Sequence, residues 1–144
     1  SEREGVTINN RDDVNPCYIP LTDTVVLPYI GLFEDPTEYY ATLFHELGHS
    51  TGPRLGRTMG TSKQSKDYAR EELVAEMSAC YLASASGLDL DDVKIRRSAD
   101  YIRLWKQRIA DDSALIVYAA GRAAKAADLV LGKTAKPEAV GVQS

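Results

Sequence analysis

DPTEYYATLFHELGHSTGP, residues 35–53, is the stretch that decides the fold, because it carries the signals for both ends of one helix. Asp35 is a favoured N-cap residue, Pro36 suits the first helical position, and Glu38 follows three residues after the cap, as in a capping box. The Gly-Pro pair that closes the stretch is typical of a helix end. The sequence therefore predicts a helix of about four turns over residues 36–51.

This helix holds both histidines of the chain, in the motif His45-Glu46-Leu47-Gly48-His49. Residues four apart lie on one helix face, so both imidazoles can bind one metal ion. Glu46 lies about 100° around the helix from His45, where its carboxylate can accept a proton from a water on the metal. The alternative is a pair of ordinary histidines, but the capping signals predict the helix independently and favour the metal site.

A catalytic zinc site takes three protein ligands and leaves one position open for water, so a third ligand is needed. No other histidine exists, but a second predicted helix, residues 67–86, carries several glutamates near its start. On a helical wheel Glu72 shares a face of small residues with Glu76 and Tyr68, whereas Glu71 lies off that face. We predict Glu72 as the third ligand and Glu76 as the acceptor that orients a ligand histidine. Tyr68 is a candidate donor to an oxyanion. The alternatives are a solvated helix start for the adjacent glutamates and simple packing for the tyrosine.

The N-terminal part of the chain is expected to form short strands. Residues 6–8, 17–20 and 24–28 are rich in β-favouring side chains, and a three-residue turn signal separates the last two runs. This spacing predicts a small antiparallel sheet. Nearby prolines cannot donate ladder hydrogen bonds, which indicates that the last two strands lie at a sheet edge. We expect the strand at 24–27 to line the cleft of the metal site and to pair with an extended peptide.

The rest of the chain is expected to be helical. Apolar residues at helical spacing predict a third helix near 93–110 and an alanine-rich fourth helix over 113–131. Residues 53–66 contain glycines and hydroxyl residues without a sustained period, and predict an exposed loop. The fold class is therefore α+β, with about four helices and a small N-terminal sheet.

Length and composition limit the classes of function. The 144 residues suit one domain, placed at 1–132, with a poorly ordered tail at 133–144. The net charge of −4 gives no general attraction to nucleic acid or anionic membranes, and no apolar run approaches the length of a membrane span. Cys17 and Cys80 are far apart and in no paired motif, which favours a reducing cytoplasm. The opening at Ser1 is compatible with a domain cut from a longer protein.

Three stretches together resemble a known family. They are CYIPLTDTVVLP (17–28), EYYATLFHELGHSTG (38–52) and YAREELVAEMSACYLA (68–83), and they resemble the metallopeptidase domain of ArdC-type antirestriction proteins, conjugative primases and phage polyvalent proteins. The resemblance is strong over residues 17–88. The E-x-x-A pattern that begins at Glu72 is also similar to the ImmA/IrrE peptidases.

The resemblance implies a zincin-like fold with one zinc ion, His45, His49 and Glu72 as ligands, and Glu46 as the general base. ArdC-like proteins also carry a separate domain that binds single-stranded DNA. Nothing in this sequence corresponds to that domain, so we expect no nucleic-acid binding by this chain. The loop at 53–66 departs from the family's pattern.

Two functions are compatible with these expectations. The first is a zinc-dependent metallopeptidase domain of a mobile-element or phage-associated protein, acting on a peptide or protein substrate. The second is a metal-stabilised protein-binding or antirestriction accessory module with little or no proteolytic activity. An intact Glu46 favours the first, because a structural metal site does not need that carboxylate.

Overall fold

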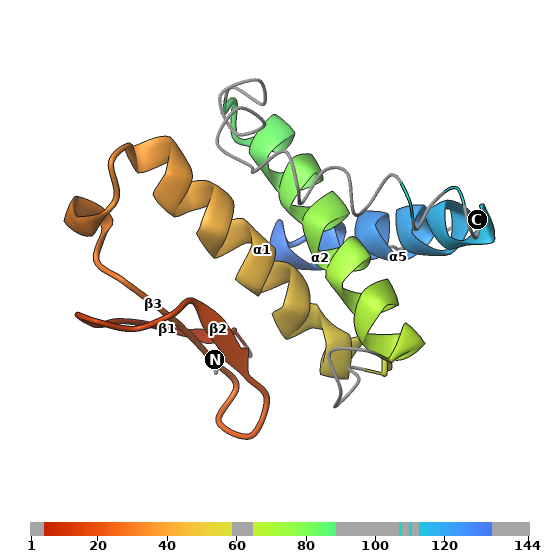
Figure 1. Cartoon of the computed structure of the whole chain (residues 1–144), viewed down its shortest axis with the longest axis horizontal. Helices are drawn as coiled ribbons and strands as arrows, with labels where there is room; N and C mark the ends of the chain where they lie inside the picture. The colour runs from red at the N-terminus through yellow and green to blue at the C-terminus, as the bar shows by residue number, and fades with distance from the viewer. Residues whose placement is uncertain (1–4, 59–64, 89–106, 108–109, 111–112, 134–144) are drawn as a thin grey trace.

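The computed structural model describes residues 5–58, 65–88, 107, 110 and 113–133. In these ranges the chain forms a small sheet, a short 3₁₀ helix η1 and three α-helices (Figure 1). The elements are β1 (Thr7–Asn10), β2 (Cys17–Ile19), β3 (Thr24–Leu27), η1 (Ile30–Leu32), α1 (Pro36–Arg54), α2 (Lys66–Ala85) and α5 (Ala114–Val130).

Helix α1 lies between the sheet on one side and helices α2 and α5 on the other (Figure 1). Two apolar clusters hold these layers together, and each buries aliphatic side chains from both of its partners. The first cluster joins the sheet to α1 through Val25, Leu27, Tyr39 and Leu43. The second joins α2 to α5 through Leu73, Val74, Leu115, Ala119 and Ala123. The predicted α+β class is confirmed.

The sheet is mixed, and the prediction of an antiparallel sheet is wrong in part. Its strand order is β1-β3-β2, in which β2 pairs antiparallel with β3 as expected, but β1 pairs parallel with β3. The residues of β3 after Thr24 are almost fully buried, so this apolar strand takes the middle position. The strand at 24–27 is therefore not an edge strand. The edge strand that faces the three predicted ligands is β2.

Helix α1 ends later than predicted, at Arg54 instead of residue 51. Pro53 lies inside its last turn, and Gly56, at φ +74°, provides the left-handed residue that ends the helix. The amide of Arg57 donates to the carbonyl of Gly52, and the amide of Gly56 donates to that of Pro53, as in a Schellman motif. A proline removes only one donor, so it does not stop a final turn whose other groups are paired.

The other helices are close to the predicted ones. Helix α2 begins after Ser65, whose hydroxyl accepts from the amide of Tyr68, and α5 matches the expected fourth helix. The third predicted helix at 93–110 and the tail after Lys133 lie outside the described residues, as does part of the loop at 53–66. In the described part of the chain no helix is both long and apolar enough to span a membrane.

The two helices that carry the candidate site pack closely at Gly48. A Cβ atom built at this position would lie 3.1 Å from the Cα of Ala75, 3.1 Å from the Cβ of Ser78 and 3.2 Å from the carbonyl oxygen of Ala75. Two of these atoms are backbone and cannot move aside. The glycine of the motif therefore allows α1 and α2 to approach within reach of a shared ligand.

Candidate metal centre

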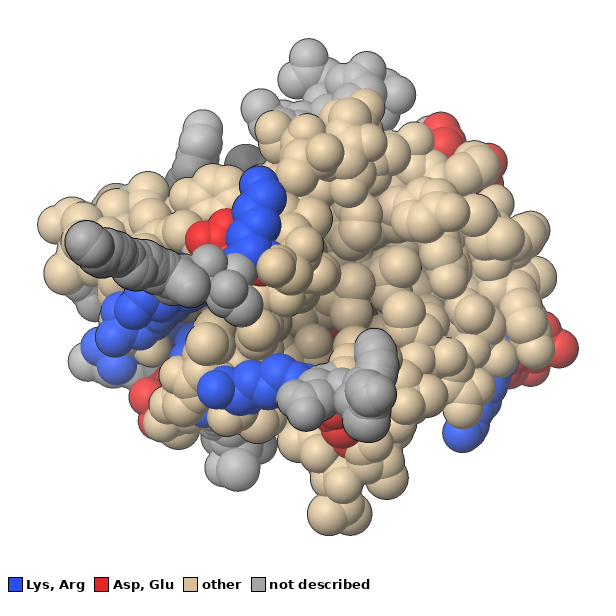
Figure 2. Space-filling view, turned by 180° about the vertical axis from the view of Figure 1, so that it is seen from behind, with Lys and Arg blue, Asp and Glu red and all other residues tan. Residues whose placement is uncertain are grey.

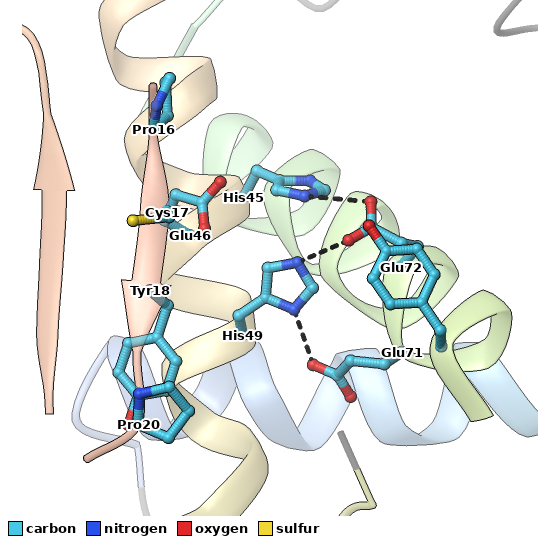
Figure 3. Close-up of a pocket in the computed structure, with 10 residues that line it drawn as sticks. Pro16, Cys17, Tyr18, Pro20, His45, Glu46, His49, Glu71 and Glu72 are labelled. Carbon is cyan, nitrogen blue, oxygen red and sulfur yellow. Dashed lines mark hydrogen bonds and ion pairs between the residues drawn. The ribbon is translucent and has the colours of Figure 1, made fainter. Parts of the chain in front are cut away.

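Helices α1 and α2 bring the three predicted ligands together. His49 Nε2 lies 2.9 Å from one carboxylate oxygen of Glu72, and His45 Nε2 lies 3.5 Å from the other (Figure 3). The ligand atoms of the three residues all lie within 4.8 Å of one another. Two successive turns of α1 and one turn of α2 are therefore enough to place two imidazoles around one carboxylate.

The donor set fits a divalent metal. Two imidazole nitrogens and a carboxylate oxygen suit zinc, and the same triad suits other divalent ions. Burial alone would lower the pKa of His45, but the carboxylates of Glu72 and Glu76 outweigh it and raise that pKa to about 10. Burial likewise raises the pKa of Glu72, but its contacts with His45 and His49 hold it well below its usual range. The pocket therefore attracts positive charge, as a cation site must.

A third glutamate contacts His49 from the other side of its ring. Glu71 Oε2 lies 2.9 Å from His49 Nδ1, while Glu72 holds Nε2 (Figure 3). Burial raises the pKa of Glu71, but hydrogen bonds from Arg57 and His49 outweigh it and lower that pKa, which favours the ionised form. An ionised carboxylate only accepts hydrogen bonds, so Glu71 favours a proton on His49 Nδ1. The Nε2 atom is then the one available to a metal.

His45 has a weaker partner at its Nδ1 atom. Glu76 Oε2 lies 3.2 Å from this nitrogen, within ion-pair distance, but the contact is not aligned as a hydrogen bond and Nδ1 has no aligned partner. Glu76 is therefore near the ring that it was predicted to orient, although its geometry is poorer than that of Glu71.

Glu46 lies next to the imidazoles without contacting them as a ligand would. It is buried, lines the same cleft, and lies between α1 and β2 (Figure 3). Burial raises its pKa, the two histidines lower it, and the neighbouring glutamates raise it again, with a net increase. A carboxylate with a raised pKa is suited to accepting and returning a proton near neutral pH.

The cleft has a volume of about 530 Å³ and lies between β2 and the ligands. Strand β2 and its flanking residues form one wall, from Pro16 to Pro20, and Tyr68 lies on the opposite side beside Glu72. Burial, together with the charge of Glu72 and a hydrogen bond to it, raises the pKa of Tyr68. The sulfur of Cys17 points away from the histidines (Figure 3).

Reasoning from the sequence missed two residues of this centre, Glu71 and Arg57. Glu71 is off the face of Glu72, as the helical wheel indicated, but that position faces the far nitrogen of His49. Arg57 reaches Glu71 because the chain turns back at Gly56. Taking Gly56 as the left-handed residue after α1 would have placed Arg57 near the site.

Known proteins resemble the chain in sequence and in fold. A family model described as zincin-like metallopeptidase matches residues 1–122. A DNA primase, TraC, of Escherichia coli is 37% identical over 129 residues, which are 88% of this chain and 12% of the primase. An uncharacterised protein of Sinorhizobium fredii is 34% identical over 113 residues, 77% of this chain and 36% of that protein. The chain thus spans only a small part of these longer relatives.

Two solved structures of the antirestriction protein ArdC from plasmid R388 share the fold. The Mn(II)-bound structure has a TM-score of 0.71 and 38% identity, and covers 90% of this chain and 48% of ArdC. The metal-free structure has a TM-score of 0.68 at the same identity. With the family model matching most of its length, the chain belongs to the zincin-like metallopeptidase family.

Proposed function

We propose that this domain hydrolyses peptide bonds with the help of one divalent metal ion held by His45, His49 and Glu72. A bound ion of this kind lowers the pKa of a water molecule that it holds and polarises a carbonyl group. The observation that carries the proposal is Glu46, a buried carboxylate that opens into the same cleft as the three ligands.

Glu46 acts as the general base. Its side chain accepts a proton from the attacking water and returns it to the leaving amine, which requires a pKa nearer neutrality than that of an ordinary glutamate. Burial raises its pKa in this direction. Because β2 covers it on one side, Glu46 is held beside the ligands and not turned out into solvent.

The substrate is proposed to lie along β2. This strand has β3 on one side only, so its other edge can pair with an extended peptide by backbone hydrogen bonds. Residues before, in and after β2 line the cleft opposite the ligands, which supports this path. Tyr68 is a candidate donor to the oxyanion, since its ring lines the cleft beside Glu72 and its hydroxyl is within reach of that ligand.

Zinc is the proposed ion, and the donor set is equally compatible with manganese, which the related ArdC structure contains.

The proposed substrate is a peptide or protein. The proposal of no nucleic-acid contact through this chain rests on the net charge of −4, and Figure 2 shows one face on which basic and acidic side chains lie among neutral ones. Cys17 and Cys80 form no disulfide, which supports the prediction of a cytoplasmic protein. The single domain at 1–132 remains a proposal.

The deciding experiment replaces Glu46 with Gln, which keeps the shape and removes the base. We expect Glu46→Gln to keep its metal and to lose peptide hydrolysis by roughly 10²- to 10⁴-fold. Glu38→Gln makes the same change in the first turn of α1, away from the cleft, and should keep full activity. If the unchanged protein binds metal and cleaves no peptide from a diverse library, the metal-stabilised binding module is the better function.

A further inference from the structure

The side chain of Arg57 is buried beside the candidate metal centre and makes four hydrogen bonds there. Its Nε and Nη2 atoms donate to the two oxygens of Glu71 at 2.8 and 2.9 Å. Its Nη1 atom donates to Thr51 Oγ1 at 2.8 Å, and Nη2 also donates to the carbonyl of Gly48 at 2.8 Å. The side chains of Arg57 and Glu71 are 3% and 2% exposed, so this pair is shielded from solvent. The two remaining partners are on α1, and Arg57 therefore joins both ligand helices.

The hydrogen bonds continue from Arg57 through Glu71 to a ligand. Glu71 accepts from His49 Nδ1 at 2.9 Å, and His49 Nε2 is the atom offered to the metal. Among the described residues, Arg57 is the arginine that forms an ion pair with a carboxylate of this acidic pocket. Without it, Glu71 would be a buried carboxylate beside Glu72 with His49 as its remaining partner, and it would be able to compete for the metal.

We propose that Arg57 is a positioning residue for the metal. It holds Glu71 as a fixed acceptor, and Glu71 holds the Nδ1 side of the His49 ring so that Nε2 faces the metal position. The bidentate geometry matters as well as the charge, because a fork of two parallel hydrogen bonds fixes the plane of the carboxylate. This inference rests on the proposed metal site and adds to it a residue from outside both ligand helices.

The same geometry couples the metal to the turn after α1. Arg57 is in place because Gly56 has a left-handed backbone and the amide of Arg57 caps the helix at Gly52. The position of the His49 ring and the conformation of residues 55–58 therefore depend on each other. Metal binding should slow the exchange of the Arg57 amide, which lies on the capping hydrogen bond.

The test compares metal affinity in Arg57→Gln, Arg57→Lys and Arg54→Gln in the full chain, with Zn²⁺ and Mn²⁺ each measured by competition with a chelator. Arg54 is the matched control, since it also makes a bidentate pair, with Asp23, but does not touch the ligands. We expect Arg57→Gln to weaken binding by on the order of 10- to 100-fold, and Arg57→Lys to lie between it and the unchanged protein. Arg54→Gln should bind as the unchanged protein does.

Two further readouts separate positioning from folding. The melting temperature of each metal-free variant reports folding, and the ¹⁵N chemical shifts of His49 report the nitrogen that keeps its proton in the metal-bound state. Unchanged affinity and unchanged shifts in Arg57→Gln would overturn the inference and leave the proposed function intact. If Arg57→Gln does not fold, the test rests on Arg57→Lys. Full metal affinity in Arg57→Lys would overturn the role of the two parallel hydrogen bonds. Failure of the unchanged chain to bind either metal overturns both proposals.

Discussion

Glu71 and Glu72 show how neighbouring residues of one type acquire different tasks. A step of one residue turns the side chain by about 100° around the helix, so Glu72 meets the Nε2 atoms and Glu71 meets the opposite side of His49. Glu71 is also held by Arg57, whereas Glu72 has no arginine partner among the residues described. A carboxylate already shared with a guanidinium is a poor ligand, and a carboxylate facing two imidazoles is a good one.

This difference predicts the effect of removing each glutamate around the histidines. Glu72→Ala should lower metal affinity by more than roughly 100-fold because a ligand is lost, and Glu76→Gln should lower it less, since Glu76 only approaches Nδ1 of His45. For both variants, metal content is measured after gel filtration and metal affinity is measured by competition with a chelator. Retention of a full metal equivalent in Glu72→Ala would contradict the choice of ligand.

Helices α1 and α2 form the metal centre as a pair, and the distance between them is set at Gly48. Its missing side chain leaves room for the backbone of Ala75, while neighbouring α1 residues carry the ligands. The same glycine accepts a hydrogen bond from Arg57 through its carbonyl. The close packing of the two helices and the placement of the ligands therefore both depend on Gly48.

Gly48→Ala should force the two helices apart. The new methyl group would meet backbone atoms, so we expect a loss of stability of about 1–3 kcal/mol together with weaker metal binding. Chemical denaturation and metal titration measure the two effects. Gly121→Ala is the control, because a Cβ there meets nothing within 4 Å and alanine favours the helical backbone of α5. Equal stability of Gly48→Ala and the unchanged protein would show that α2 can shift without cost.

The whole molecule places a negatively charged centre between a sheet and a helix pair. Four glutamates surround two imidazoles, and they are Glu46, Glu71, Glu72 and Glu76. One apolar cluster packs the sheet against α1 and the other packs α2 against α5, so the centre is supported by packing that does not depend on the metal. We therefore expect the fold to persist without metal at reduced stability.

Removal of metal should lower the melting temperature of the chain. Metal at about 100 times its dissociation constant stabilises the folded state by about 2.7 kcal/mol, which corresponds to roughly 5–10 °C for a domain of this size. Calorimetry with saturating Zn²⁺ and after chelation measures the shift. Glu72→Ala should show no such shift, and an identical melting temperature of the unchanged protein with and without metal would contradict a metal centre.

The sequence by itself determined helix α1 and the residues that it offers to a metal. Asp35 and Pro36 start the helix through local hydrogen bonding and a fixed φ angle, and a spacing of four places His45 and His49 on one face. Glu72 followed from the same helical geometry applied to α2. The two helices are confirmed because they depend on contacts within one element, and the ligand roles of these residues stay predictions.

Only the tertiary structure decided how the remaining parts meet. The parallel pairing of β1 with β3, which moves the cleft wall from β3 to β2, depends on which strand is buried deepest and not on any local signal. The link from Arg57 through Glu71 to His49 depends on a turn at Gly56 and on the position of Glu71 on α2, 14 residues after Arg57. The local sequence pattern determines which side chains each helix or strand presents, whereas long-range packing determines which of these side chains become neighbours.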